Sequence, residues 1–158
     1  MPGEFSLTCH LGSDPETVRE HVMNPALFFH LASPLICARD IGERPIGGRR
    51  TEGEYRISMK IFGLLPIGWQ VILVDLSGSG EGKGVLRDRG YGPLLREWDH
   101  RILVSERSEG GTQYTDALRL DAGALTPIVA FFVRQFFKHR QRRLIALDKA
   151  GFAPLANV

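Results

Sequence analysis

The sequence contains few cysteines and none of the short motifs that carry metal or hydrolase chemistry. Cys9 and Cys37 are its only cysteines, and they match neither a CxxC pair nor a zinc-binding spacing. HExxH, EF-hand and GxSxG spacings are also missing. We therefore expect no metal site and no cofactor, and nothing supports a serine hydrolase.

A targeting or membrane-spanning segment is not recognisable either. The first residues, MPGEFSLTCHLG, have neither the basic region nor the apolar core of a signal peptide. No apolar run approaches the ~20 residues that a membrane helix requires. One disulfide between the two cysteines is arithmetically allowed, but nothing else suggests secretion. We expect a cytoplasmic protein with reduced thiols.

A strong excess of one charge is missing as well. The formal net charge is +2, which by itself does not argue for nucleic-acid binding, and we expect no nucleic-acid partner. Four cations nevertheless crowd residues 138–143. They suit the C-terminal half of a helix, where cations oppose the helix dipole, so a solvated helix face is the first interpretation. Transient contact with an anionic membrane is the alternative.

What the sequence does contain is the composition of an ordinary globular protein. Of its 158 residues, 43% are hydrophobic and 24% are charged, so we expect a single domain over 1–158. Apolar periodicity and the proline and glycine breaks predict the elements. The first part of the chain is expected to contain a strand at 4–11, short helices at 15–23 and 25–31, an irregular strand at 35–41 and a loop at 42–50. Strands are then expected at 53–61, 69–76, 83–89, 95–106 and 112–121, with a glycine-rich hairpin tip at 77–82, before a 24-residue helix between Thr126 as N-cap and Gly151.

This order predicts an α+β protein with a helix-grip arrangement. Strands and helices do not alternate as they do in a parallel α/β sheet. A sheet of about seven antiparallel strands curls strongly, and its concave face can hold the long C-terminal helix. The two short helices after the first strand can fill the open end of that sheet.

The long C-terminal helix has a broad apolar face that changes in character along its length. On a helical wheel, Ile128, Val129, Phe132, Val133, Phe136, Ala146 and Leu147 share this face. His139 and Arg143 lie on the same face. We therefore expect a pocket between helix and sheet that is apolar near the start of the helix and cationic further along.

Several local stretches, together with the element order, carry a resemblance to a known superfamily. They are Phe28-Phe29-His30-Leu31-Ala32-Ser33-Pro34, Gly53-Glu54-Tyr55, Pro66-Ile67-Gly68-Trp69-Gln70, Trp98-Asp99-His100, Gly111-Thr112-Gln113-Tyr114-Thr115-Asp116 and Leu125-Thr126-Pro127. Over essentially its whole length the chain resembles the START-like helix-grip superfamily (SRPBCC), which includes lipid-transfer domains, polyketide cyclases and aromatases. The resemblance implies a cavity for a hydrophobic small molecule or lipid, and it does not imply one activity.

Three polar residues on strand faces are candidates for catalysis. His100 shares a face with Trp98, so it is expected in the pocket, where it could donate a hydrogen bond or act as a general base. The alternative is a histidine satisfied by a neighbouring group. Asp116 shares a face with Tyr114 and could orient His100 or accept from a ligand. The alternative is an ion pair between Asp116 and a helix arginine.

Arg143 and His139 are candidates for a polar end of the pocket. An arginine on a pocket-facing helix stripe could bind a ligand carboxylate or phosphate in a fork. Two alternatives remain open. Arg143 could pair with Asp99 or Asp116, or the helix could pass the sheet edge and leave the side chain in solvent.

Three functions fit these candidates. The first is binding or carriage of a hydrophobic small molecule or lipid, without catalysis. The second is a cyclase, dehydratase or aromatase that uses His100 with Asp116 or Tyr114. The third is a peripheral membrane adaptor. The candidate ligand-binding residues are Phe28, Phe29, Tyr55, Met59, Trp69, Trp98, His100, Tyr114, Phe132, Phe136, His139 and Arg143.

Overall fold

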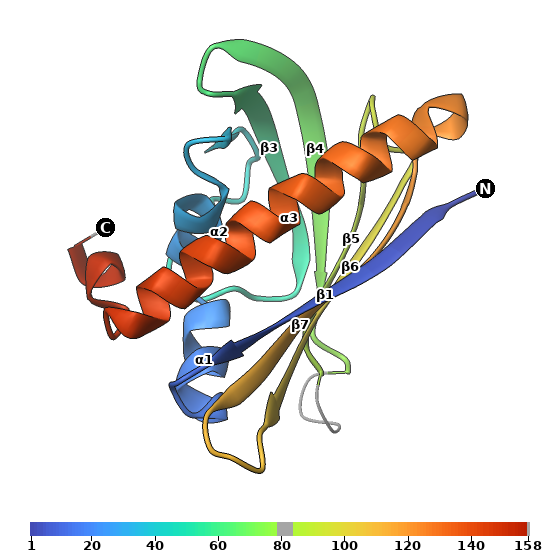
Figure 1. The fold of residues 1–158 in the computed structure, drawn as a ribbon. Coiled ribbons are helices and arrows are strands. Elements are labelled where there is room, and N and C mark those ends of the chain that lie inside the picture. The colour runs from blue at the N-terminus through green and yellow to red at the C-terminus, as the bar shows by residue number, and fades with distance from the viewer. Residues whose placement is uncertain (79–83, 158) are drawn as a thin grey trace.

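Seven antiparallel strands form one sheet that bends around a long C-terminal helix (Figure 1). The computed structural model describes residues 1–78 and 84–157, so most of the predicted hairpin tip at 77–82 lies outside the described residues. The strand order is β1-β7-β6-β5-β4-β3-β2. The predicted α+β helix-grip class is confirmed. The strands are β1 (Gly3–Leu11), β2 (Ile36–Asp40), β3 (Gly53–Ile61), β4 (Leu65–Asp75), β5 (Gly84–Tyr91), β6 (Glu97–Glu106) and β7 (Thr112–Asp121).

Two short helices follow β1, as the sequence predicts, and both begin at an Asx-Pro pair. In α1 (Pro15–Val22), the Asp14 carboxylate accepts from the Thr17 amide at 3.0 Å. In α2 (Pro25–Ala32), the Asn24 side chain accepts from the Ala26 amide at 2.9 Å. Each proline occupies the first helical turn, where its missing N–H leaves no acceptor unsatisfied. Beside the C-terminal half of α3, α1 contacts β5, β6 and β7, and α2 contacts β2 and α3 (Figure 1).

The long helix α3 (Thr126–Lys149) begins one residue earlier than predicted. Leu125 stands at the N-cap and makes no side-chain capping bond, so the prediction of Thr126 as the N-cap is wrong. The Thr126 hydroxyl accepts from the Ala122 amide and lies 2.7 Å from the Gly123 carbonyl, to which it donates. It therefore stabilises the short 3₁₀ turn η1 (Gly123–Leu125) that precedes the helix.

The buried face of α3 is rotated by about one residue, or ~100°, from the predicted stripe. Phe132 and Ile128 are 64% and 59% exposed, although the wheel assigned them to the pocket. The wheel failed because it scored apolar residues only, whereas four of the seven buried residues are polar. Thr126, Gln141 and Asp148 have specific hydrogen-bond partners, and Arg140 is considered below. The buried residues of α3 are Thr126, Phe137, Arg140, Gln141, Leu144, Leu147 and Asp148.

The basic run at 138–143 is divided between solvent and the interior. Lys138 and Arg142 are exposed, which agrees with the predicted solvated face. Arg140 is only 6% exposed, so for this residue the solvated interpretation is wrong. Membrane contact through the exposed cations stays a prediction. Among the described residues, no helix combines the length and the apolar character of a membrane span.

The densest part of the core lies under the C-terminal half of α3. Leu144 and Leu147 pack there against β1 and the short helices, and Phe152 follows in the terminal 3₁₀ turn region. The Asp148 carboxylate accepts from the amides of Gly12 and Ser13, at 2.7 and 3.1 Å, and ties the end of β1 to the helix. Beside the N-terminal half and the middle of α3, by contrast, a cavity lies between helix and sheet.

Candidate functional site

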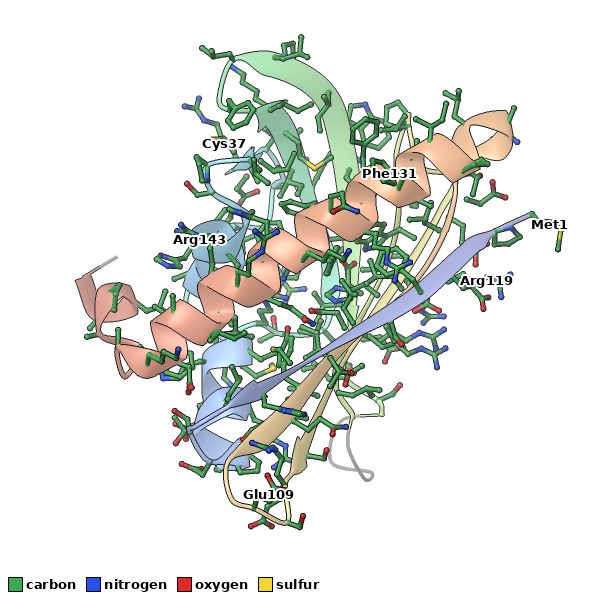
Figure 2. All side chains as sticks on the ribbon, viewed as in Figure 1. Met1, Cys37, Glu109, Arg119, Phe131 and Arg143 are labelled. Atoms are coloured by element: carbon green, nitrogen blue, oxygen red, sulfur yellow. The ribbon has the colours of Figure 1, made fainter. Side chains whose placement is uncertain are left out.

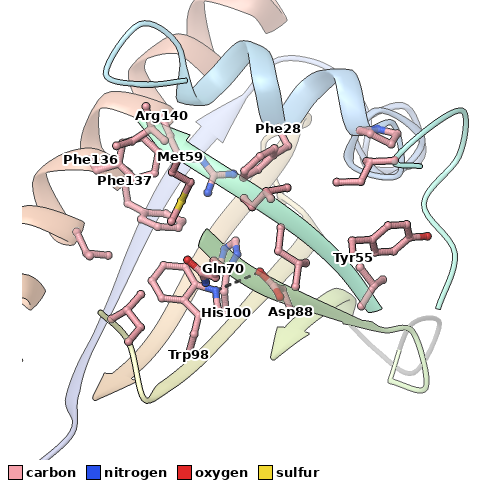
Figure 3. Close-up of a pocket in the computed structure, with 18 of the residues that line it drawn as sticks. Phe28, Tyr55, Met59, Gln70, Asp88, Trp98, His100, Phe136, Phe137 and Arg140 are labelled. Atoms are coloured by element: carbon pink, nitrogen blue, oxygen red, sulfur yellow. Dashed lines mark hydrogen bonds between the residues drawn. The ribbon is translucent and has the colours of Figure 1, made fainter. Parts of the chain in front are cut away.

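A cavity of about 170 Å³ lies between α3, the concave face of the sheet, α2 and the loop of residues 41–52 (Figure 3). The cavity surface is mostly apolar, and aromatic residues from α2, β6 and α3 form much of it. Polar groups enter it at a few points from the loop, β4, β5, β6 and α3. The aromatic lining residues are Phe28, Tyr55, Trp98, Phe136 and Phe137, and the polar ones are Arg49, Arg50, Gln70, Asp88, His100 and Arg140.

Arg140 projects from the buried face of α3 into this cavity (Figure 3). Its guanidinium carbon lies 4.5 Å from the centre of the Phe137 ring and 5.9 Å from that of Phe28. These cation–π contacts stabilise the charge without using its N–H groups. The buried Arg140 Nε has no hydrogen-bond partner within the described chain. A buried donor without an acceptor is unusual, because it has lost its hydrogen bonds to water and gained none in the protein.

Arg50 reaches the same cavity from the loop of residues 41–52. Its backbone amide donates to the Met23 carbonyl at 2.7 Å, which anchors the loop against the end of α1. Its guanidinium carbon lies 5.8 Å from the centre of the Phe28 ring, so Arg50 and Arg140 both contact this ring. Burial lowers the pKa of Arg50 to about 10, and the side chain therefore still carries its charge at neutral pH.

Asp88 on β5 is the third member of this group. The Trp98 indole donates to its Oδ2 at 3.1 Å, and its Oδ1 has no partner within the described chain (Figure 3). Burial raises the pKa of Asp88 to about 7, against the opposing effect of Arg50. We refer to Arg50, Asp88 and Arg140 together as the open cluster, because two of its buried polar atoms lack partners.

A second buried polar group is centred on Asp116, which is 1% exposed. His100 Nε2 lies 2.8 Å from Asp116 Oδ1, and the Tyr114 hydroxyl donates to the same oxygen at 3.2 Å. The Gln141 amide donates to Asp116 Oδ2 at 2.9 Å and to the Leu7 carbonyl at 2.8 Å. We call His100, Tyr114, Asp116 and Gln141 the Asp116 network. Both carboxylate oxygens in it are satisfied.

The protonation states of this network follow from its burial. Burial lowers the pKa of His100 and outweighs the hydrogen bond to Asp116, so the imidazole is neutral at neutral pH. Burial alone would raise the pKa of Asp116, but hydrogen bonds and charge from His100 hold it below its usual value. Neutral His100 must then donate from Nε2, which leaves Nδ1 as an acceptor. Among the described residues, Nδ1 makes no hydrogen bond.

Half of the predicted ligand-binding residues line the cavity, and half do not. The arrangement that the sequence predicted around Trp98 and His100 is present, with both side chains on the concave face. His100 and Asp116 are in direct contact, and among the described residues Asp116 forms no ion pair with a helix arginine. The residues in the lining are Phe28, Tyr55, Met59, Trp98, His100 and Phe136, and those outside it are Phe29, Trp69, Tyr114, Phe132, His139 and Arg143.

The aromatic residues outside the lining have identifiable reasons for their positions. Gln70 and Ile72 of β4 line the cavity, so Trp69 points to the other face of the strand, where it is 40% exposed and contacts Arg56. The nearly continuous apolar run at 69–76 suggests a strand covered on both faces, and the exposure of Trp69 shows that this is wrong at its first residue. Phe132 faces solvent on the outer side of α3. Tyr114 is buried behind Asp116, and Phe29 packs edge-on against Phe28 away from the cavity.

His139 and Arg143 hold α3 against α2 rather than forming the cationic end of the pocket (Figure 2). Arg143 Nε donates to the His30 carbonyl at 2.9 Å, and His139 Nε2 lies 3.2 Å from the Ser33 carbonyl. They thus satisfy carbonyls at the C-terminal end of α2, which lack helical partners. Neither predicted partner of Arg143 is used, since Asp99 pairs with Arg87 at 2.6 Å.

The open cluster was missed by sequence reasoning, although a signal for Arg140 exists. Val133, Phe137, Arg140, Leu144 and Leu147 follow a regular 4-3-4-3 spacing, which is typical of one buried helix stripe. Arg140 occupies a central position of that stripe. Asp88 is likewise in phase with buried Leu86 on β5. A charged residue in phase with buried neighbours indicates a buried charge that needs a partner, which a charged run by itself does not.

Comparisons with solved structures place the fold in a well-populated group. A START superfamily protein from Mycobacterium smegmatis is 12% identical, with a TM-score of 0.65, covering 93% of this chain and 97% of that one. A protein from Chromobacterium violaceum is 14% identical, with a TM-score of 0.67, covering 91% and 96%. The Zhui aromatase/cyclase from Streptomyces sp. R1128 is 11% identical, with a TM-score of 0.60, covering 94% and 92%. At these identities the likeness shows the fold alone.

Sequence comparisons define the family. No curated protein sequence matches the chain. Within the described residues, no group of three or more histidine, cysteine or acidic side chains could hold a metal ion. Residues 40–147 match the profile of a family described as a domain of unknown function, DUF8410. This match includes every strand from β3 to β7 and most of α3. The chain therefore belongs to the DUF8410 family and has the START-like helix-grip fold.

Proposed function

We propose that this chain, as one domain over 1–158, binds or carries a hydrophobic small molecule or part of a lipid in the cavity beside α3. The observation that carries the proposal is an apolar cavity that contains buried polar atoms without protein partners. Such a combination is typical of ligand sites, in which apolar walls supply affinity and a few polar groups supply orientation. The aromatase/cyclase likeness supports a cavity of this kind.

The size of the cavity limits the ligand. Its volume is about 170 Å³, and an apolar cavity of roughly 150 Å³ can hold a single aromatic ring. A ring system of one or two rings, or a short branched chain, fits this space better than a long acyl chain. Phe28, Trp98 and Phe137 offer ring faces and edges to such a molecule.

Native mass spectrometry of the protein purified from its own cells tests the proposal. A repeated mass increment, with an extractable ring-bearing or short-chain compound, supports it. Binding of 2-naphthamide by isothermal titration gives a second measurement. The variant Val133→Trp fills the cavity from α3, whereas Ile128→Trp changes an exposed position of the same helix. If Val133→Trp binds both the co-purified compound and 2-naphthamide as well as Ile128→Trp does, the cavity is not the site.

Catalysis is a second candidate, and the His100–Asp116 contact favours it. An ionised carboxylate fixes the tautomer of a neutral imidazole, whose Nδ1 is then a potential general base on a cavity-lining residue. The co-purified compound should then change chemically when it is incubated with the unloaded protein. In His100→Gln the rate should fall by ~10²–10⁴, as for the loss of a general base. A compound that mass spectrometry finds unchanged after long incubation leaves only the binding function.

A further inference from the structure

The open cluster places two guanidinium groups beside one apolar cavity and provides neither with a protein acceptor. Among the described residues, Arg50 and Arg140 form no ion pair within 4.0 Å and no side-chain hydrogen bond. Both contact the Phe28 ring, and Arg140 also lies over Phe137. Stacking on a ring stabilises the charge through the face of the guanidinium. It leaves the N–H groups at the edge without acceptors.

The carboxylates of residues 1–78 and 84–157 do not meet this need. Asp116 lies behind His100, and both of its oxygens are occupied by the Asp116 network. Asp88 accepts from the Trp98 indole, and neither arginine is within ion-pairing distance of it. A guanidinium is nevertheless adapted to bind a planar carboxylate through two parallel hydrogen bonds. Among the described residues no acceptor serves these donors, which is what a site for an anionic ligand requires.

We infer that the ligand of this cavity is a hydrophobic carboxylate, whose head group accepts from Arg140 and Arg50 while its ring or short chain packs against Phe28, Trp98 and Phe137. This inference rests on the proposed binding function and specifies its ligand class. It moves the cationic end of the pocket from Arg143 to Arg140, which lies three residues earlier on α3 and lines the cavity.

Asp88 opposes an anion in the cavity when it is ionised. It faces Arg50 from the loop, Arg140 from α3, and Trp98 and neutral His100 from β6. Because burial raises its pKa to about 7, a carboxylate arriving near neutral pH favours protonation of Asp88. The protonated carboxyl group can then donate from Oδ1, the atom that lacks a partner, to the ligand head group.

The test compares ligands that differ in charge and share a shape. The full chain is titrated calorimetrically with 2-naphthoate against 2-naphthamide, and with benzoate against benzamide. In the wild-type protein each carboxylate should bind about tenfold or more tightly than its amide, as expected for charge-assisted hydrogen bonds. In Arg140→Met this preference should fall to about twofold or less, with little change in amide affinity. Arg142→Met, an exposed position on the same helix, should behave as the wild type.

The possible failures are distinguishable. If the amides bind but the carboxylates bind no better, the anionic ligand class is wrong and the hydrophobic cavity stands. Retention of the full preference in Arg140→Met also overturns the inference. If no member of either pair binds, the proposed function is wrong for ring-sized ligands, and this inference is wrong as well. Arg140→Lys keeps the charge and loses the fork, so it should fold and show an intermediate preference.

Discussion

The Asp116 network and the open cluster are two buried polar groups of the same interior, and they differ in how completely they are satisfied. In the Asp116 network, a carboxylate receives hydrogen bonds from His100, Tyr114 and Gln141. In the open cluster, Asp88 Oδ1 and Arg140 Nε have no partner in the described part of the chain. The two groups share the neighbourhood of His100 and α3. Burial alone therefore does not distinguish a structural polar group from one that is prepared for a ligand.

Hydrogen-bond satisfaction makes that distinction. A fully satisfied network specifies how strands and helix meet, and here it connects β1, β6, β7 and α3. An unsatisfied charged group destabilises the unliganded fold and stabilises the complex when a ligand completes it. The stability effects of mutation should therefore have opposite signs in the two groups.

The largest effect is expected from Asp116→Ala, which removes the centre of the network. The donors of His100, Tyr114 and Gln141 would remain buried without their acceptor. Removing one partner of a buried charged interaction costs ~3–5 kcal/mol, and urea unfolding measures this loss. Asp99→Ala breaks an ion pair with Arg87 on the more exposed face, and it should cost about 1 kcal/mol or less. Equal losses in the two variants would show that the Asp116 network stabilises the fold no more than a partly exposed ion pair does.

A pH-dependent effect of similar size is expected at Asp88. Its pKa is about 7 in the folded protein, against 3.8 as the ordinary value, so the unfolded chain releases this proton first. Asp88 should therefore lower the free energy of unfolding as pH rises from about 4 to about 7, by up to ~4 kcal/mol in total. Asp88→Asn should remove this slope and keep the Trp98 hydrogen bond.

Urea unfolding of the wild type and Asp88→Asn at about pH 5 and about pH 8 measures the slope. The advantage of the asparagine variant should grow with pH. Asp99→Asn is the control, because Arg87 holds the pKa of Asp99 below its usual value. The stability that Asp99 contributes is present above its unfolded pKa and is lost only in acid, so this control should give no difference in slope over the same range. An Asp88 difference that shrinks with pH would contradict the pKa shift.

A smaller effect of the opposite sign is expected from Arg140→Met without ligand. The substitution replaces a buried, unpaired charge with an apolar side chain of similar length. Such replacements are neutral or stabilising, and we expect a gain of about 1–2 kcal/mol in the free energy of unfolding. Thermal and urea unfolding of the unloaded protein measure it. A loss greater than about 2 kcal/mol would show that the cation–π contacts of Arg140 are structural.

The smallest effect is expected from Tyr114→Phe, which deletes one hydrogen bond of the Asp116 network. Asp116 Oδ1 keeps its bond from His100, so the loss should be about 1 kcal/mol in urea unfolding. Tyr55→Phe provides the comparison at the cavity, since the Tyr55 hydroxyl contacts only Thr51 among the described residues. It should cost less than Tyr114→Phe. The reverse order would mean that the network is less tightly coupled than its geometry indicates.

The sequence predicted the order and type of the elements because period-2 and period-3.6 patterns depend on local geometry. The strand faces holding Trp98 and His100 followed from alternation and are confirmed. The orientation of α3 could not be found in the same way, because partners from β1 and β7 compensate the polar side chains on its buried face. The position of Trp69 follows from alternation along β4, because Gln70 and Ile72 face the cavity and Trp69 faces the other way.

The pairing of β1 with β7 has a consequence for the order in which the chain can fold. Every residue of β1 pairs with a strand about 100 residues later, as Thr8 does with Thr115. During synthesis at ~5–20 residues per second, β1 leaves the ribosome roughly 5–20 s before its partner is complete. For that time its apolar face and backbone edge have no native partner, and only local contacts can protect them. Closure of the sheet, and with it the cavity, is therefore expected to be the last and slowest step of folding.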